Sequence, residues 1–288
     1  MAAPSIVDVI GRPADLRSID IVDVGANPLS GDKGPYQSLV DNGLASLVGF
    51  EPDPAAFDKL QAIKGPRETY VPIAVGDGQR HQFRICTMSG MNSLLAPNFA
   101  LLDLVHLHGI WAQVRSLVDV DTKRLDDIAE IEAMDYLKID IQGGEMLVFE
   151  NATEKLKDCL VVHTEVMFVP MYEGQPLFSE QELFLRKFGL QVHKFFELQG
   201  HVLKPFAVCG DVHAPLSQLF WADVIFIKDL TRLERLRPEQ LLKLAIILHD
   251  VYKSVDVAHL VLQAYDKASS TTLAPKYEAF LTQVPIAA

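Results

Sequence analysis

The fold is decided by two stretches of sequence, Ile19-Asp-Ile-Val-Asp-Val-Gly-Ala-Asn27 and Leu47-Val-Gly-Phe-Glu-Pro-Asp-Pro54. Each reads as an apolar strand that ends at a glycine or an acid, and a nucleoside cofactor needs both endings. The first provides a turn where a ligand can approach the backbone closely, and the second provides a carboxylate for the two ribose hydroxyls. The pair therefore predicts a nucleoside site at Gly25 and Glu51.

The glycine pattern after the first strand is not that of a pyrophosphate-binding loop. The fingerprint G-x-G-x-x-G would need small residues where Asn27, Pro28 and Ser30 stand. A nucleotide-dependent oxidoreductase on a similar sheet is therefore the weaker alternative. S-adenosylmethionine, a nucleoside without phosphates, fits these residues better.

The composition is that of an acidic globular protein, with 288 residues, 49% of them hydrophobic, and a formal net charge of −12. Phosphate binding needs a cationic face, so a nucleic-acid partner is not expected. No apolar run approaches the roughly 18 residues of a membrane span, and the N-terminus lacks the basic head of a secretory signal. The three cysteines lie far apart, which predicts reduced thiols in a cytoplasmic protein and no metal site.

Strand-like and helix-like segments alternate, which predicts an α/β fold with a mostly parallel sheet covered by helices. Asp53 should cap a helix that begins at Pro54. Ser179-Glu-Gln-Glu182 reads as a capping box that opens another helix through Phe188, with a stop at Gly189. The expected strands are residues 20–24, 46–50, 69–75, 82–86, 136–141, 160–166, 191–198 and 222–227.

Two regions interrupt this alternation. Residues 87–116 form a long insertion, of the kind that often makes a lid over a site. After Lys228 the pattern becomes helical, from Pro238 and again over residues 255–268. We therefore expect one domain over residues 1–228 and a helical C-terminal extension over residues 229–288, which packs on the domain or joins two subunits as a homodimer.

The segment Tyr136-Leu-Lys-Ile-Asp-Ile-Gln-Gly-Gly-Glu145 reads as a buried strand, a tight turn and the start of a helix. In an open parallel sheet, ligands lie outside the carboxyl ends of the strands. The strands that carry Asp23 and Asp140 should therefore flank one crevice, where carboxylates can hold the methionine ammonium and offset the sulfonium charge. Taken alone, the segment favours a joint whose polar groups only cap the helix, but together with Asp23, Gly25 and Glu51 it favours the crevice.

Together these motifs resemble the FkbM family of S-adenosylmethionine-dependent methyltransferases. The resemblance rests on Asp23-Val-Gly-Ala-Asn27, Phe50-Glu-Pro-Asp53, Thr122-Lys-Arg-Leu-Asp-Asp127 and Leu137-Lys-Ile-Asp-Ile-Gln-Gly-Gly-Glu145, in this order over about residues 19–170 and more loosely through Ile227. It implies a Rossmann-like class I methyltransferase fold with a seven-stranded sheet. It also implies methyl transfer to a hydroxyl of a sugar, a glycan or a small secondary metabolite.

The resemblance also implies roles for individual residues. The methionine end of the donor would lie against Asp23, Gly25, Ala26 and Asn27, the ribose against Glu51, and the methyl group against Asp140. We further expect Pro52, Asp53 and Ala74 beside the donor, and Asn92, Ser93, Gln142 and Glu145 beside the acceptor. Two features depart from the family pattern: the loop over residues 28–35 is longer, and Gln142 stands where many members have a second acid.

Methyl transfer is an in-line displacement, so alignment of the reacting atoms can contribute on the order of 7–11 kcal/mol, and a positioned base could add about 10²–10⁴-fold. The strand that ends Val161-Val-His-Thr-Glu165 places His163 and Glu165 on one side by alternation. Our hypothesis is that His163 takes the acceptor proton or orients the acceptor, with Glu165 as its partner or an alternative base and Asp140 completing the catalytic set. A polar pair that only satisfies a strand end is an equally good interpretation.

Two other patterns carry less chemistry. His106 and His108 lie two residues apart without a third metal ligand in view, and Trp111 with Arg115 has the spacing of local helix packing. A non-catalytic, methyltransferase-like scaffold that binds a partner through its helical tail is the remaining alternative. The intact acids Asp23, Glu51 and Asp140 favour a working cofactor site instead.

Overall fold

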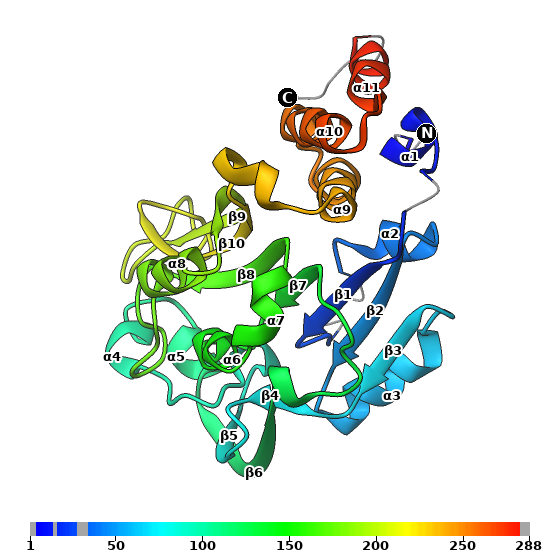
Figure 1. Cartoon of the computed structure of the whole chain (residues 1–288). Helices are drawn as coiled ribbons and strands as arrows, with labels where there is room; N and C mark the ends of the chain where they lie inside the picture. Colours follow the sequence, from blue (N-terminus) through cyan, green and yellow to red (C-terminus); the bar gives the residue numbers. More distant parts are fainter. Residues whose placement is uncertain (1–3, 14–15, 28–33, 283–288) are drawn as a thin grey trace.

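The computed structural model describes residues 4–13, 16–27 and 34–282. Its centre is a seven-stranded sheet with the strand order β3-β2-β1-β7-β8-β10-β9 (Figure 1). Neighbouring strands pair in parallel from β3 to β8, and only β10 runs antiparallel to both of its neighbours. The predicted α/β, Rossmann-like class I methyltransferase fold is confirmed.

The strands of the large sheet are β1 (Ile19–Val24), β2 (Ala45–Phe50), β3 (Glu68–Val71), β7 (Tyr136–Ile139), β8 (Val161–Met167), β9 (Leu190–His201) and β10 (Gln218–Lys228). A second sheet holds β4 (Ala74–Gly76), β6 (Val114–Arg124) and β5 (Arg80–Cys86). The single strand predicted over residues 69–75 is wrong, because it is two strands of different sheets. Pro72 separates them, since it has no N–H to continue a ladder.

The first face of the large sheet carries the side chain of Ile21, and we call it the α9 face. One hydrophobic core joins this face to α9 (Pro238–Asp250), α2 (Gln37–Asp41) and α10 (Val255–Ser269). The predicted helical tail therefore packs on the sheet. The helices α1 (Ile6–Ile10) and α11 (Leu273–Leu281) gather with it at the end where β1 begins (Figure 1).

The opposite face is covered by α6 (Glu145–Glu150), α7 (Thr153–Asp158) and α8 (Phe178–Arg186), which form a second hydrophobic core with it. Successive residues of β8 enter alternate cores, Val161 the first and Val162 the second. This is the alternation that strand geometry dictates. It assigns His163 and Glu165 to the α9 face.

Two helix starts test the capping signals in the sequence. α3 (Pro54–Ile63) begins as predicted, with Asp53 Oδ1 accepting a hydrogen bond from the Ala56 N–H at 2.8 Å. The capping box predicted at Ser179 is wrong. α8 begins at Phe178, because the Glu180 carboxylate reaches back to the Leu177 N–H at 2.8 Å.

The insertion forms three short helices, η1 (Ser89–Met91), α4 (Phe99–Leu102) and α5 (His108–Trp111). It is joined to the connection between β9 and β10, where the Lys204 N–H donates to the Leu104 carbonyl at 2.8 Å. His106 Nε2 also lies 2.8 Å from the Phe206 carbonyl oxygen.

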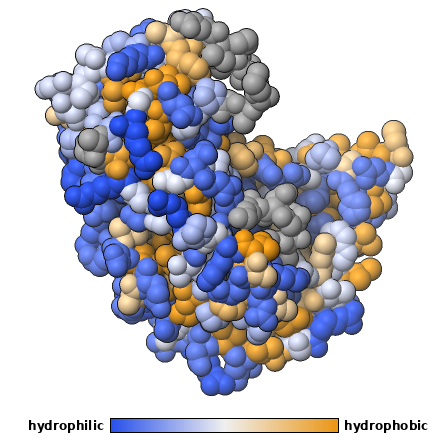
Figure 2. Space-filling model, turned by 90° about the vertical axis from the view of Figure 1, so that its right-hand side faces the viewer, coloured by the Kyte–Doolittle hydropathy of each residue, from blue (hydrophilic) through white to orange (hydrophobic). Residues whose placement is uncertain are grey.

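In Figure 2 the surface is hollowed beside the lobe at the top of the view. In the described part of the chain, no helix is long and apolar enough to cross a membrane.

Candidate active site

The carboxyl ends of β1, β2 and β7 are tied together at the turn that follows β1. The N–H groups of Gly25 and Ala26 both donate to the Phe50 carbonyl, at 3.1 and 3.0 Å, and the Asp140 N–H donates to the Val24 carbonyl at 3.1 Å. Gly25 has φ +87°, and a Cβ atom there would lie 2.2 Å from the Asp140 carbonyl oxygen. Only glycine allows this close approach.

Glu51 follows β2 directly and is 5% exposed. Its Oε1 atom accepts a hydrogen bond from the Asp53 N–H at 2.8 Å, which holds the carboxyl group beside the strand tip. Burial raises the pKa of Glu51 to about 7, against the lowering effect of this hydrogen bond. Glu51 is thus a hydrogen-bond acceptor whose protonation changes near neutral pH. It lies next to the Gly25 turn, where the sequence predicted a ribose-binding acid.

Asp23 is the second-last residue of β1 and is buried on the α9 face. Its Oδ2 atom accepts a hydrogen bond from the Tyr36 hydroxyl. Its Oδ1 atom lies 3.7 Å from Lys138 Nζ and has no hydrogen-bond partner among the described residues. The carboxylate is therefore only half satisfied.

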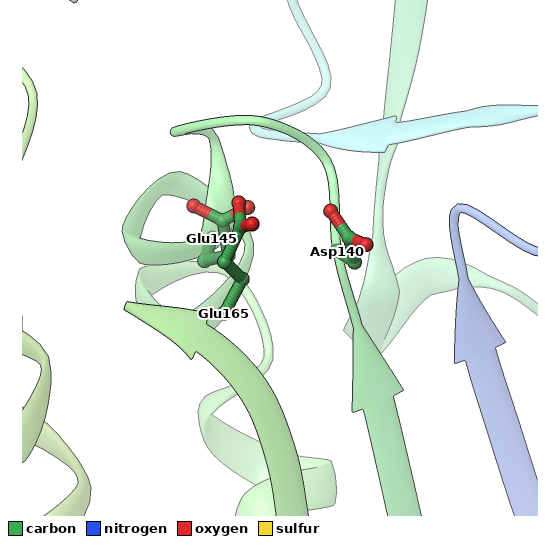
Figure 3. Close-up of side chains that lie close together, drawn as sticks. All are labelled: Asp140, Glu145 and Glu165. Atoms are coloured by element: carbon green, nitrogen blue, oxygen red, sulfur yellow. The ribbon is translucent and has the colours of Figure 1, made fainter. Parts of the chain in front are cut away.

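Three acids meet beyond the ends of β7 and β8. Asp140 follows β7, Glu145 begins α6 and Glu165 lies near the end of β8, with the last two side by side (Figure 3). One oxygen from each lies within 4.8 Å of the others. Gln142 Nε2 bridges the group by donating to Asp140 Oδ1 at 3.0 Å and Glu165 Oε2 at 3.2 Å.

Burial governs the protonation of this acid group. It raises the pKa of Glu145 to about 7, although Glu145 Oε1 accepts hydrogen bonds from the Ile141 and Gly143 N–H groups. Burial raises the pKa of Glu165 well above its usual range, and the neighbouring charge of Asp140 adds to this. Such a cluster can share protons, or its oxygens can ligate a hard cation.

His163 lies deeper on the α9 face and is 3% exposed. Its Nδ1 atom lies 3.2 Å from the Tyr252 hydroxyl and 3.3 Å from the Tyr136 hydroxyl. Its Nε2 atom lies 3.3 Å from Asp223 Oδ2. That contact satisfies the distance of an ion pair, but not the geometry of a hydrogen bond.

The other predicted site residues are distributed unevenly. Ser93 is buried and donates to the Gln142 carbonyl at 2.6 Å, which anchors the insertion to the turn after β7. Asn92 Oδ1 accepts from the Cys86 N–H instead. Asn27 and Ala74 lie half-buried and Pro52 is exposed. Of the longer loop, residues 28–33 lie outside the described ranges.

Sequence reasoning missed Asp223 and Tyr252. Asp223 pairs across the strands with Glu165, and Tyr252 lies between α9 and α10, in the part predicted to be an appendage. Neither residue belongs to a sequence motif, and Tyr252 lies far from His163 along the chain. No local pattern could have found them.

A cavity of about 610 Å³ lies at the opposite end of the strands, near Arg17, Asp135 and Lys243. It surrounds the amino ends of β1 and β7, far along the strands from Gly25 and Asp140. Parallel sheets bind ligands at the carboxyl ends. The cavity therefore does not compete with the acid-lined crevice as the candidate site.

The strand order and the glycine turn beside an acid define a methyltransferase-type α/β protein with a crevice at the strand tips. The model of the methyltransferase FkbM domain matches residues 23–192, which is more than half of the chain. The chain belongs to the FkbM methyltransferase family, as the sequence motifs predicted.

One relative and two solved structures illustrate the similarity. The chain is 28% identical over 183 residues to the 2-O-methyltransferase NoeI of Sinorhizobium fredii, covering 59% of this chain and 70% of that protein. A precorrin-6y C5,15-methyltransferase from Geobacter metallireducens shares 14% identity at a TM-score of 0.35, covering 78% of this chain and 86% of the other. The plantazolicin methyltransferase BpumL shares 10% identity at a TM-score of 0.36, covering 73% and 77%.

Proposed function

We propose that this protein is an O-methyltransferase that uses S-adenosylmethionine as the methyl donor. The observation that carries the proposal is the joint placement of Gly25, Glu51 and Asp140 at three adjacent strand tips. A cradle that a single Cβ atom would close, next to a buried acid, fits a nucleoside with a charged tail. The family membership and the 2-O-methyltransferase relative support the same chemistry.

Different residues of the site would contact different parts of the donor. Glu51 would accept hydrogen bonds from the ribose hydroxyls, the turn from Gly25 to Asn27 would lie against the methionine part, and Asp140 would face the positive charge. When bound, the donor supplies an activated methyl group to an acceptor oxygen. The protein's own contribution is to hold the acceptor hydroxyl in line with the methyl group and to receive its proton on the acidic face beside the ends of β7 and β8.

The proposed acceptor is a small molecule or a carbohydrate with a free hydroxyl. Asp140, Glu145 and Glu165 line the proposed acceptor side with acidic groups, and the chain carries a net charge of −12. Carboxylates accept hydrogen bonds from hydroxyl groups, whereas they repel phosphates. A nucleic-acid acceptor is therefore disfavoured.

The test is calorimetry with S-adenosylhomocysteine, the product of the donor. We expect binding to the wild type, and a loss of affinity of about 1.5–3 kcal/mol, or roughly 10–150-fold, in Glu51→Ala, because a hydrogen bond to a charged group is removed. Glu130→Gln is the matched control, since Glu130 is an exposed acid. Tight binding of NAD in place of S-adenosylhomocysteine, or unchanged affinity in Glu51→Ala, would reject the proposal.

A further inference from the structure

Asp223 is the acid of this region that no motif identifies. It lies on β10, beyond the matched residues 23–192, and it is the cross-strand partner of Glu165. Its side chain is 28% exposed, whereas that of His163 beside it is 4% exposed. Of the two groups, Asp223 is the one that a bound molecule can reach.

The protons on Tyr136, Tyr252 and His163, which lie beside Asp223, can be assigned by counting hydrogen-bond donors and acceptors. Burial raises the pKa values of Tyr136 and Tyr252 far enough that both hydroxyls stay protonated. Their oxygens lie 2.7 Å apart, so one tyrosine donates to the other and the remaining hydrogen points to His163 Nδ1. We infer that His163 Nδ1 accepts this hydrogen, in the tautomer whose ring proton lies on Nε2, toward Asp223.

Two buried polar atoms on the same face make no hydrogen bond within the described residues. They are Asp23 Oδ1 and His163 Nε2. Lys138 is the register partner of both Asp23 and His163, on the strand between them, and its Nζ atom lies 3.7 Å from Asp23 Oδ1. Buried polar atoms are almost always satisfied, so this row indicates a hydroxylated ligand or ordered water at the site.

We propose that Asp223 is a catalytic residue that accepts the proton of the acceptor hydroxyl, and that Tyr252, Tyr136 and His163 are positioning residues that orient it. This inference rests on the proposed function. As the O–H bond breaks, its electron pair stays on the oxygen that forms the new bond to the methyl carbon, the sulfur keeps the pair of the S–C bond, and the proton resides on Asp223 until solvent removes it. The C-terminal helices thus complete the acceptor side.

Phe196 supplies the apolar part of the same surface. Its ring lies 5.4 Å from that of His163 and 6.2 Å from that of Tyr252, and the residue is 45% exposed. Phe195 is equally exposed at 43%, but its ring contacts Phe168 and Phe178 instead. The two residues form a matched pair for the test.

The first measurement needs no acceptor. Nitrogen NMR of the histidine rings, with His163→Gln to identify the signal, reports which nitrogen carries the proton. We expect a His163 ring proton on Nε2 and none on Nδ1, and we expect Tyr252→Phe to change this signal while leaving calorimetric binding of S-adenosylhomocysteine unchanged. A proton on Nδ1, or a His163 signal that ignores Tyr252→Phe, overturns the positioning role.

The second measurement uses a panel of methyl hexopyranosides as probes, with the protein saturated by S-adenosylhomocysteine. We expect saturation-transfer NMR to detect binding, weakened at least about tenfold by Asp223→Asn and by Phe196→Ala but unchanged by Phe195→Ala. With the donor present, Asp223→Asn should lower turnover of the best binder by about 10²-fold or more, and more than His163→Gln does.

These outcomes separate the two proposals. Failure of S-adenosylhomocysteine to bind the wild type rejects the proposed function itself. If it binds but no hexopyranoside does, or if Asp223→Asn leaves binding and turnover intact, only the inference about Asp223 fails. A larger loss in His163→Gln than in Asp223→Asn also overturns it, and would make His163 the base, as the sequence predicted.

Discussion

The proposed donor edge and the proposed acceptor side of this molecule are built in different ways. The donor edge, at the tips of β1, β2 and β7, is held by backbone hydrogen bonds such as those from Gly25 and Ala26 to Phe50. The proposed acceptor side, on β8 and β10, is held by side chains, among them Tyr252 from the turn between α9 and α10. Backbone geometry can be encoded in a short motif, whereas side-chain networks require the whole fold.

The family match reflects this difference. Residues 23–192 include the entire donor edge, but they end before Asp223 and Tyr252. Function is specified by sites rather than by the fold that carries them. We infer that the donor chemistry is common to the family, while the acceptor side of this protein depends on contacts that its own C-terminal region makes.

The attachment of the C-terminal helices offers the largest expected effect. Lys243 on α9 is buried and lies 2.6 Å from Asp135 Oδ2, at the amino end of β7. Lys243→Met should lower the free energy of unfolding by about 3–5 kcal/mol, because it leaves Asp135 as an unpaired buried charge. Urea denaturation measures the change, with Lys276→Met as the control because Lys276 is an exposed lysine of the same helical region. Equal stability of the two variants would show that this ion pair does not hold the helices.

The glycine turn of the donor edge should give the next largest effect. In Gly25→Ala, the alanine would be strained by the positive φ, and its Cβ atom would lie only 2.2 Å from the Asp140 carbonyl oxygen. The strain and the overlap each cost about 1–3 kcal/mol. Gly174→Ala is the control, because Gly174 has φ +68° but open space around its Cβ position. We expect Gly25→Ala to abolish S-adenosylhomocysteine binding in calorimetry and Gly174→Ala to retain it. Similar binding by both variants would mean that the close approach does not shape the site.

The same contrast explains what the sequence could predict. The turn at Gly25, the acid Glu51 and the N-cap Asp53 lie within short segments, where residue type and spacing fix the backbone. The apolar strands were found because burial on both faces leaves continuous hydrophobic runs. β6 was missed because nearly all of its residues are exposed, so no buried stripe marks it.

The acceptor side could be predicted only in part. Strand alternation correctly put His163 and Glu165 on one face, but nothing in the sequence shows that Tyr252 and Asp223 enclose the two ring nitrogens of His163. The single strand predicted over residues 69–75 was likewise wrong, because its two parts belong to different sheets and are separated at Pro72. Such pairings depend on how distant segments pack, and tertiary context overrides local propensity there.

The protonation of Glu51 should give the smallest effect, and it bears on the donor edge alone. Burial raises the pKa of Glu51 to about 7 in the free protein, so folding favours the protonated form. Its contribution to stability is fully present below the ordinary pKa of about 4.5 and is lost as the pH rises through about 7. Ribose binding has the opposite requirement, because only the carboxylate accepts hydrogen bonds from both hydroxyls.

Donor affinity should therefore fall as the pH is lowered through 7, approaching a tenfold loss per pH unit when one proton must be released on binding. Calorimetry of S-adenosylhomocysteine between about pH 5.5 and pH 8.5 measures this slope, and Glu51→Gln should flatten it. Burial raises the pKa of Glu145 to about 7 as well, so Glu145→Gln is the necessary control and should keep the slope. A slope that disappears in Glu145→Gln instead would place the responsive proton on the acceptor side, and the separation of the two regions would not hold.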